Sequence, residues 1–201
     1  MSQTPKHQLM DRLAEEVSNC RRCDLCELRE NVVFGEGDLE TAVVLVGEAP
    51  GRREDEEGRP FVGSAGKLLN RILDETGLNR GDIYITNIVK CRPPGNRRPN
   101  QGEVEECATH LDKQLSLIEP RVIVPMGNSA TGYFLKRHGL RRQAIGSIHG
   151  HVLPIKAAWG DTKLYPIYHP AAILYNRRLE EDLRSDLRAL RKLIDPGLSS
   201  H

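Results

Sequence analysis

The stretch TAVVLVGEAPG, residues 41–51, decides the fold class of this chain. Residues 41–46 are an unbroken aliphatic and β-branched run, which predicts a buried strand, and the glycine-rich segment 47–51 ends it. Further segments have the same strand character, at residues 82–88, 121–126 and 164–168. Amphipathic stretches that predict helices lie between and after these runs, at residues 64–76, 101–118, 129–137 and 179–194. This alternation predicts a three-layer α/β/α domain with a central, mostly parallel, four-stranded sheet.

The rest of the chain adds smaller elements to this plan. Residues 8–19 predict a first helix, and residues 145–155 predict a hairpin or an irregular segment. With 201 residues the chain is long enough to bury one full core. We therefore expect a single domain over residues 1–195 and a disordered tail over residues 196–201.

Each predicted strand has glycine or a polar residue at its end or directly after it. The segment from Gly47 to Gly51, Asn87, Gly127 and His169 all fall at strand ends. In open α/β sheets, ligands bind outside the carboxyl ends of the strands. The sequence therefore predicts that these residues share one site.

The glycines near this site do not match the known phosphate-binding loops. Phe61 stands five residues before Gly66, where a P-loop needs glycine, and Lys67 is followed by Leu68 instead of Ser or Thr. The spacing of Gly47 and Gly51 also fails to give the G-x-G-x-x-G fingerprint of dinucleotide-binding folds.

Three side chains near the strand ends each have a structural and a functional interpretation. Phe61 either packs under the start of the helix over residues 64–76 or forms a platform on which a planar ring stacks. Asn87 is either a turn residue or an amide whose adjacent donor and acceptor match the imide edge of uracil. His169 is either a core histidine or a hydrogen-bond donor to a carbonyl oxygen that carries charge.

Four cysteines predict a metal centre. Cys20 and Cys23 are separated by two residues, whereas Cys91 and Cys107 are separated by fifteen. Such spacing in a chain without an export signal favours metal binding over disulfides, and it leaves zinc and a 4Fe–4S cluster both open. Cys26 is interpreted as a packed thiol or an alternative ligand. A structural role for the metal is favoured, because no group suited to redox chemistry lies beside these cysteines.

Charge and hydropathy limit the classes of partner. The formal net charge is +1, so affinity for nucleic acid must come from local basic clusters, such as Arg97 with Arg98 and Arg177 with Arg178. No apolar run approaches the ~20 residues that a membrane span needs. We therefore expect a cytoplasmic protein, which keeps its thiols reduced and has no membrane partner.

Long motifs resemble one known family. GEAPGRREDEEGRPFVGSAGKLLNRIL, ITNIVKCRPPGNRRP and YHPAAILYN occur in that order, and together they resemble the iron–sulfur uracil-DNA glycosylases of family 4. The resemblance extends over residues 18–192. It implies the uracil-DNA glycosylase fold, excision of uracil from single- or double-stranded DNA, and a 4Fe–4S cluster on Cys20, Cys23, Cys91 and Cys107. The chain is expected to act as a monomer.

The resemblance also implies roles for individual residues. The backbone of Gly47, Glu48 and Ala49 would line the uracil pocket, with Phe61 stacked on the base. Asn87 would read the O4/N3 edge, His169 would contact O2, and Glu48 would be the acidic catalytic residue. Glu54 would lie near the C5 side of the ring.

DNA contacts are expected at residues outside that pocket. Leu174 lies in the loop expected after His169 and is the first choice for insertion into the space that the base vacates. Arg97, Arg177 and Arg178 are candidates for phosphate contacts. Two rival functions stay open: a nucleic-acid-binding module without catalysis, and a glycosylase for thymine or deaminated-purine lesions.

Overall fold

The computed structural model describes residues 5–195 and places five strands in one sheet, in the order β2-β1-β3-β5-β4. Strands β2, β1, β3 and β5 are parallel, and β4 pairs with β5 in the antiparallel sense. The strands are β1 (Val43–Gly47), β2 (Tyr84–Asn87), β3 (Val122–Pro125), β4 (Leu153–Ala157) and β5 (Gly160–Leu164). The α/β class and the mostly parallel sheet are therefore as predicted.

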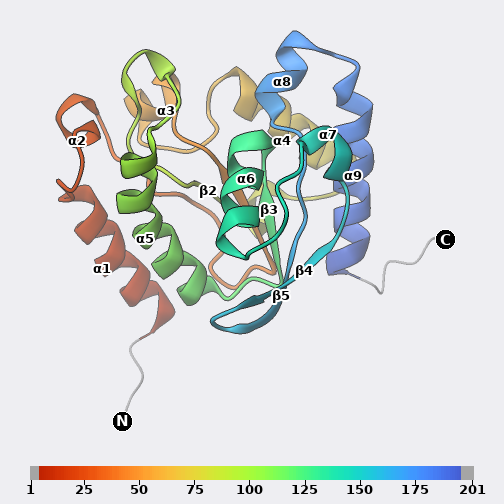
Figure 1. Cartoon of the computed structure of the whole chain (residues 1–201), viewed down its shortest axis with the longest axis horizontal. Coiled ribbons are helices and arrows are strands. Elements are labelled where there is room, and N and C mark those ends of the chain that lie inside the picture. The colour runs from red at the N-terminus through yellow and green to blue at the C-terminus, as the bar shows by residue number, and fades with distance from the viewer. Residues whose placement is uncertain (1–4, 196–201) are drawn as a thin grey trace.

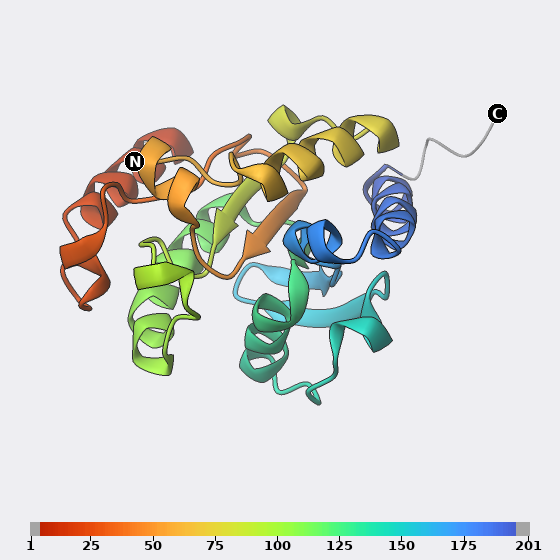
Figure 2. The same ribbon diagram turned by 90° about the horizontal axis from the view of Figure 1, so that it is seen from above.

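Helices cover both faces of this sheet (Figures 1 and 2). One face packs against α5 (Gln101–Ile118) and α6 (Gly127–Arg137), with α1 (Lys6–Ser18) packed on α5, and the other face packs against α4 (Ser64–Thr76), α8 (Pro170–Tyr175) and α9 (Leu179–Ile194). Consecutive residues of β1 alternate between these two cores: Val44 and Val46 belong to the first, Val43 and Leu45 to the second. Both faces of β1 are therefore buried, which explains why residues 41–46 form a continuous apolar run instead of alternating apolar and polar residues.

Short helical turns complete the chain between these elements. They are α2 (Leu25–Leu28), α3 (Arg52–Glu57), α7 (Ile145–Ile148) and the 3-10 turns η1 (Arg80–Asp82) and η2 (Pro94–Asn96). The charged stretch after Gly51 folds as α3, which places Glu54 and Asp55 in its first turn, where the helix dipole favours acidic residues. The loop expected after His169 is also a helix, α8.

The predicted strand count and two boundaries near the C-terminus were wrong. The sheet has five strands instead of four, and the hairpin is formed by β4 and β5 instead of lying within residues 145–155. Residues 160–163 are Gly-Asp-Thr-Lys, and in β5 mostly polar side chains face outward, so this strand lacks the apolar run that marks a buried strand. The segment 164–168 continues from β5, and Ile167 forms an isolated bridge with Met126.

Two further expectations are limited by the described range. The predicted tail, residues 196–201, lies outside the described residues. Between residues 5 and 195, no helix has the length and apolar character needed to cross a membrane.

The sheet brings the expected strand ends together. Gly47 and Asn87 are partners in the parallel register of β1 and β2, and the Met126–Ile167 bridge places His169 beside them. Gly127 has a φ of +81°, and a Cβ on it would lie 2.8 Å from the Cβ of His169. Glycine at this position therefore allows the end of β3 to approach His169 closely.

Candidate active site

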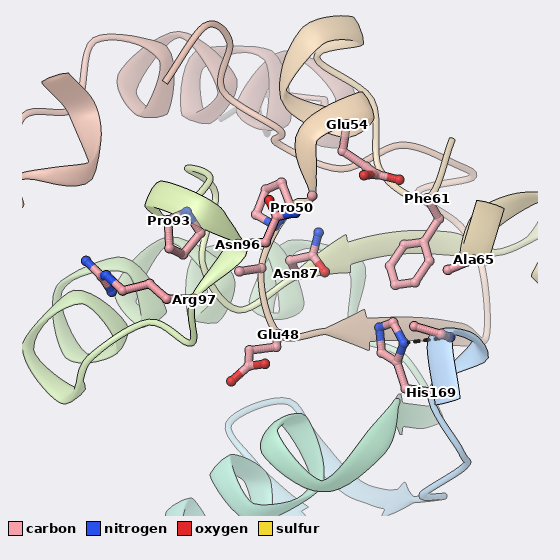
Figure 3. Close-up of a pocket in the computed structure, with 13 residues that line it drawn as sticks. Glu48, Pro50, Glu54, Phe61, Ala65, Asn87, Pro93, Asn96, Arg97 and His169 are labelled. Atoms are coloured by element: carbon pink, nitrogen blue, oxygen red, sulfur yellow. Dashed lines mark hydrogen bonds between the residues drawn. The ribbon is translucent and has the colours of Figure 1, made fainter. Parts of the chain in front are cut away.

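A pocket of about 370 Å³ opens at the carboxyl ends of β1 and β2. Figure 3 shows its lining, to which segments far apart in the chain contribute. Seven of the site residues expected from the sequence line it: Glu48, Ala49, Glu54, Phe61, Asn87, Arg97 and His169. The size and the few polar groups are typical of a site for a small planar ligand.

Gly47 lies under this pocket, close to two of its side chains. A Cβ added to Gly47 would lie 2.2 Å from Asn87 Oδ1 and 2.8 Å from Phe61 Cζ. Glycine is therefore needed for the close approach of the Asn87 amide and the Phe61 ring to the backbone of β1.

Phe61 has an unusual backbone conformation, with a φ of 52°. Arg80 supports this turn, because its guanidinium donates to the carbonyl oxygens of Pro60 at 2.6 Å and Phe61 at 3.3 Å and also pairs with Glu36. The Phe61 ring centroid lies 5.6 Å from that of His169. Left-handed backbone at a large side chain is a strained arrangement that occurs often at ligand sites.

Asn87 presents a polar atom without a protein partner. The residue is 2% exposed, and its Oδ1 has no hydrogen bond among the described residues. A buried acceptor without a donor costs about 1–3 kcal/mol. This oxygen therefore indicates a ligand that supplies a donor.

His169 is held as a neutral ring. Its Nδ1 accepts the backbone N–H of Ala171 at 3.1 Å, so in the neutral ring the proton belongs on Nε2. Burial lowers the pKa of His169 to about 4, with Glu54 acting in the opposite direction. The imidazole is therefore an uncharged Nε2–H donor near pH 7.

The two acidic residues of the site have different surroundings. Glu48 is half-buried and lines both this pocket and a neighbouring groove between α5 and α6. Glu54 accepts the backbone N–H groups of Val62 at 3.0 Å and Gly63 at 2.8 Å, which ties α3 to the start of α4. The geometry leaves Glu48 able to act on water or on a sugar, whereas Glu54 holds the turn that carries Phe61.

The residues expected to contact DNA lie around the pocket or beyond it. Leu174 is 50% exposed on α8, and Arg177 and Arg178 are exposed between α8 and α9. Arg97 lines the pocket, and its guanidinium forms a bidentate pair with Glu103 at 2.6 and 2.8 Å. Tyr175, which we did not single out from the sequence, is 93% exposed beside Leu174.

Sequence reasoning also missed Arg80, and a long-range contact explains why. Its partners Glu36 and Pro60 are 44 and 20 residues away, and no local pattern marks such a contact. The helix α8, in contrast, carried a usable signal: His169 caps it, and Pro170 stands at its first position, where proline is favoured.

All five cysteines line a second cavity, between α1, α2 and α5, and none of them forms a disulfide. Arg29 Nη1 donates to Cys91 Sγ at 3.1 Å, and the Lys90 backbone N–H donates to Cys107 Sγ at 3.2 Å. In the described part of the chain, no three Cys, His, Asp or Glu side chains form a group that could hold one metal ion. The five thiols line one cavity, and two N–H donors lie beside them, which is a donor set that suits thiolate ligands of a metal centre.

Comparison with known proteins agrees with this arrangement. Residues 34–193 match the model of the uracil DNA glycosylase superfamily. The chain belongs to the uracil-DNA glycosylase superfamily.

Curated relatives show which members of this superfamily the chain is similar to. The type-4 uracil-DNA glycosylase of Archaeoglobus fulgidus is 44% identical over 92% of this chain and 92% of its own. The type-4 uracil-DNA glycosylase of Saccharolobus solfataricus is 40% identical over 92% of this chain and 86% of its own. The type-4 uracil-DNA glycosylase of Thermotoga maritima is 44% identical over 87% of this chain and 88% of its own. The resemblance expected from the motifs is thereby confirmed.

Proposed function

We propose that this chain is a uracil-DNA glycosylase that excises uracil from DNA and leaves an abasic site. The observation that supports this proposal most is the buried Oδ1 of Asn87, which has no partner within residues 5–195 and shares one pocket with Phe61 and the neutral ring of His169. A planar base with a donor and an acceptor along one edge meets all three groups.

Recognition of uracil rests on the Asn87 amide. Its Oδ1 accepts the N3–H of uracil, and its Nδ2 donates to O4. Cytosine presents the reverse pattern at N3 and C4, so it leaves buried polar groups unpaired, which supports discrimination of ~10⁴-fold or more. Phe61 stacks on the ring, and Glu48 and Ala49 line the pocket beside it, whereas Gly47 lies beneath them in contact with the Phe61 ring and the Asn87 amide.

Cleavage breaks the bond between C1′ of the sugar and N1 of uracil, and the bonding electrons leave with the base. The Nε2–H of His169 donates to O2, where negative charge grows, and a preorganised donor of this kind contributes roughly 3–4 kcal/mol. A neutral histidine suits this role, because it donates a hydrogen bond without transferring a proton to the uracil anion.

Water completes the reaction at C1′. Glu48 stands at the pocket wall toward the adjacent groove, where its carboxylate orients the water and accepts a proton as the C–O bond forms. The same negative charge stabilises the cationic sugar before the water adds.

The base reaches this pocket only after it leaves the stack, at a cost of ~a few kcal/mol. Leu174 inserts into the vacated space, and Arg177 and Arg178 hold the strand through its phosphates. Arg97 contributes at the pocket rim, where Glu103 fixes its orientation.

Cys20, Cys23, Cys91 and Cys107 would hold a 4Fe–4S cluster. When bound, the cluster supplies a structural crosslink between the segment after α1, the loop after β2 and helix α5. Arg29 and the Lys90 backbone N–H donate to two of the thiolates and reduce their negative charge.

A cleavage assay with single-lesion oligonucleotides tests the function. We expect release of uracil, followed by strand scission in alkali. Control oligonucleotides that carry cytosine or thymine in place of uracil should not be cleaved. Binding without an abasic product would instead identify a nucleic-acid-binding module. Preference for thymine or a deaminated purine would identify a different glycosylase specificity.

A further inference from the structure

Lys90 is a fully buried lysine in the segment that joins the pocket to the cysteine cavity, and its burial lowers its pKa to about 7. Its side chain is 0% exposed, and Nζ donates to Thr86 Oγ1 at 2.6 Å, to the Asn87 carbonyl at 2.7 Å and to Gln114 Oε1 at 2.5 Å. An ammonium group has three donors and no acceptor. These three oxygens therefore satisfy it completely.

The oxygens that receive Lys90 are themselves fixed. The Thr86 hydroxyl donates to the carbonyl of Phe34 at 2.8 Å. The Gln114 Nε2 donates to the same carbonyl at 3.0 Å and to the Tyr84 hydroxyl at 3.0 Å. Lys90 thus joins β2 to α5 through a closed set of hydrogen bonds.

The backbone around Lys90 connects the two sites directly. The N–H groups of Ile88 and Val89 donate to the carbonyls of Gly47 and Glu48, each at 3.0 Å, and the N–H of Lys90 reaches Cys107 Sγ. The Lys90 side chain then returns to the carbonyl of Asn87. It therefore fixes the peptide group that follows the base-reading residue.

We propose that Lys90 is a positioning residue that orients the Asn87 amide for base recognition, although Lys90 does not line the pocket. This inference rests on the proposed function. The Asn87 Oδ1 would lie 2.2 Å from a Cβ on Gly47, so the amide has little room in which to turn. Without the Nζ donor, the Asn87 carbonyl loses its buried partner, and rotation of the peptide group tilts the amide away from the uracil edge.

The test compares Lys90→Met with Lys113→Met in the metal-loaded chain. Lys113 is an exposed lysine of α5, paired with Glu16, and serves as the matched control. For Lys90→Met we expect inhibition by free uracil to weaken roughly tenfold, the change for losing one charge-assisted hydrogen bond. We also expect lower discrimination between uracil and cytosine and unchanged affinity for abasic-site DNA. Lys113→Met should match the wild-type protein in inhibition by uracil, in discrimination between uracil and cytosine, and in affinity for abasic-site DNA.

Iron content and visible absorption of each preparation show that the cysteine site is intact. Unchanged inhibition by uracil in Lys90→Met with full iron content would overturn the inference, as would an equal loss of uracil and DNA affinity. If Lys90→Met does not fold, Gln114→Met is the second variant, because it removes one Lys90 acceptor and keeps the lysine. Weaker inhibition of Gln114→Met by uracil supports the proposal, and inhibition equal to that of the wild-type protein overturns it. Uracil release by the wild-type chain in the same assay tests the proposed function separately.

Discussion

At the residue scale, three neighbouring residues give the pocket its shape and its polar groups. Gly47 leaves space for the Asn87 amide and the Phe61 ring, the amide oxygen has no partner among the described residues, and His169 presents Nε2–H. Asn87 and His169 follow predicted strands, so the strand pattern was enough to expect them in one site. Arg80 was not predictable, because it supports Phe61 through contacts distant in sequence.

Asn87→Asp tests base reading directly. An aspartate keeps the acceptor for N3–H but loses the donor for O4, so we expect single-turnover excision of uracil to slow by roughly two decades or more, with some excision of cytosine. Cleavage of uracil- and cytosine-containing oligonucleotides on gels provides the measurement. Unchanged specificity would refute the role of Asn87.

The pH dependence of excision tests the neutral state of His169. Its pKa is lowered to about 4, so the ring stays uncharged as pH falls through 6.5, and we expect a constant single-turnover rate until pH nears about 4. Because the unfolded chain binds this proton nearer pH 6.5, the unfolding free energy should fall as pH decreases between these values. His7→Ala, at an exposed residue, serves as the control. A rate midpoint near pH 6.5 that persists in His7→Ala but disappears in His169→Gln would contradict the neutral state of His169.

At the element scale, the helix α8 carries both a site residue and an exposed apolar side chain. His169 caps the helix, and Leu174 lies one turn further along. The sequence predicted a loop here, although Pro170 at the first helical position was an available signal. The β4–β5 hairpin was harder to predict, because its polar side chains face outward.

Leu174→Ala tests insertion of this helix into DNA. The substitution removes apolar area that fills the gap left by the base, so we expect excision from duplex DNA to slow roughly tenfold and excision from single strands to change little. Leu28→Ala, in the exposed part of α2, is the matched control. Equal slowing on both substrates would argue against a wedge.

At the scale of the whole molecule, the sheet places two sites beside one connecting segment. Residues 87–91 run from Asn87, which lines the pocket, to Lys90 and Cys91, which line the cysteine cavity. Apolar periodicity predicted the strands β1, β2 and β3 and the long helices α4, α5, α6 and α9, but not the polar strand β5 or the short helices α3 and α8. The choice between zinc and a cluster was not, because sequence spacing does not reveal how far apart the thiols lie.

Cys91→Ser tests the cysteine site as a structural crosslink. We expect loss of iron and of visible absorption, together with a lower thermal unfolding temperature, because the link between the loop after β2 and the N-terminal segment is removed. Cys26→Ser should keep full iron content if the four other cysteines are the ligands. Iron loss in Cys26→Ser with retention in Cys91→Ser would reverse this assignment.

A crystal structure of the chain with free uracil gives the most direct test of the shared strand-end pocket. We expect the ring to lie against Phe61 with its N3 and O4 edge at Asn87 and its O2 near His169 Nε2. An empty pocket at saturating uracil, or a ring bound elsewhere on the molecule, would contradict the account.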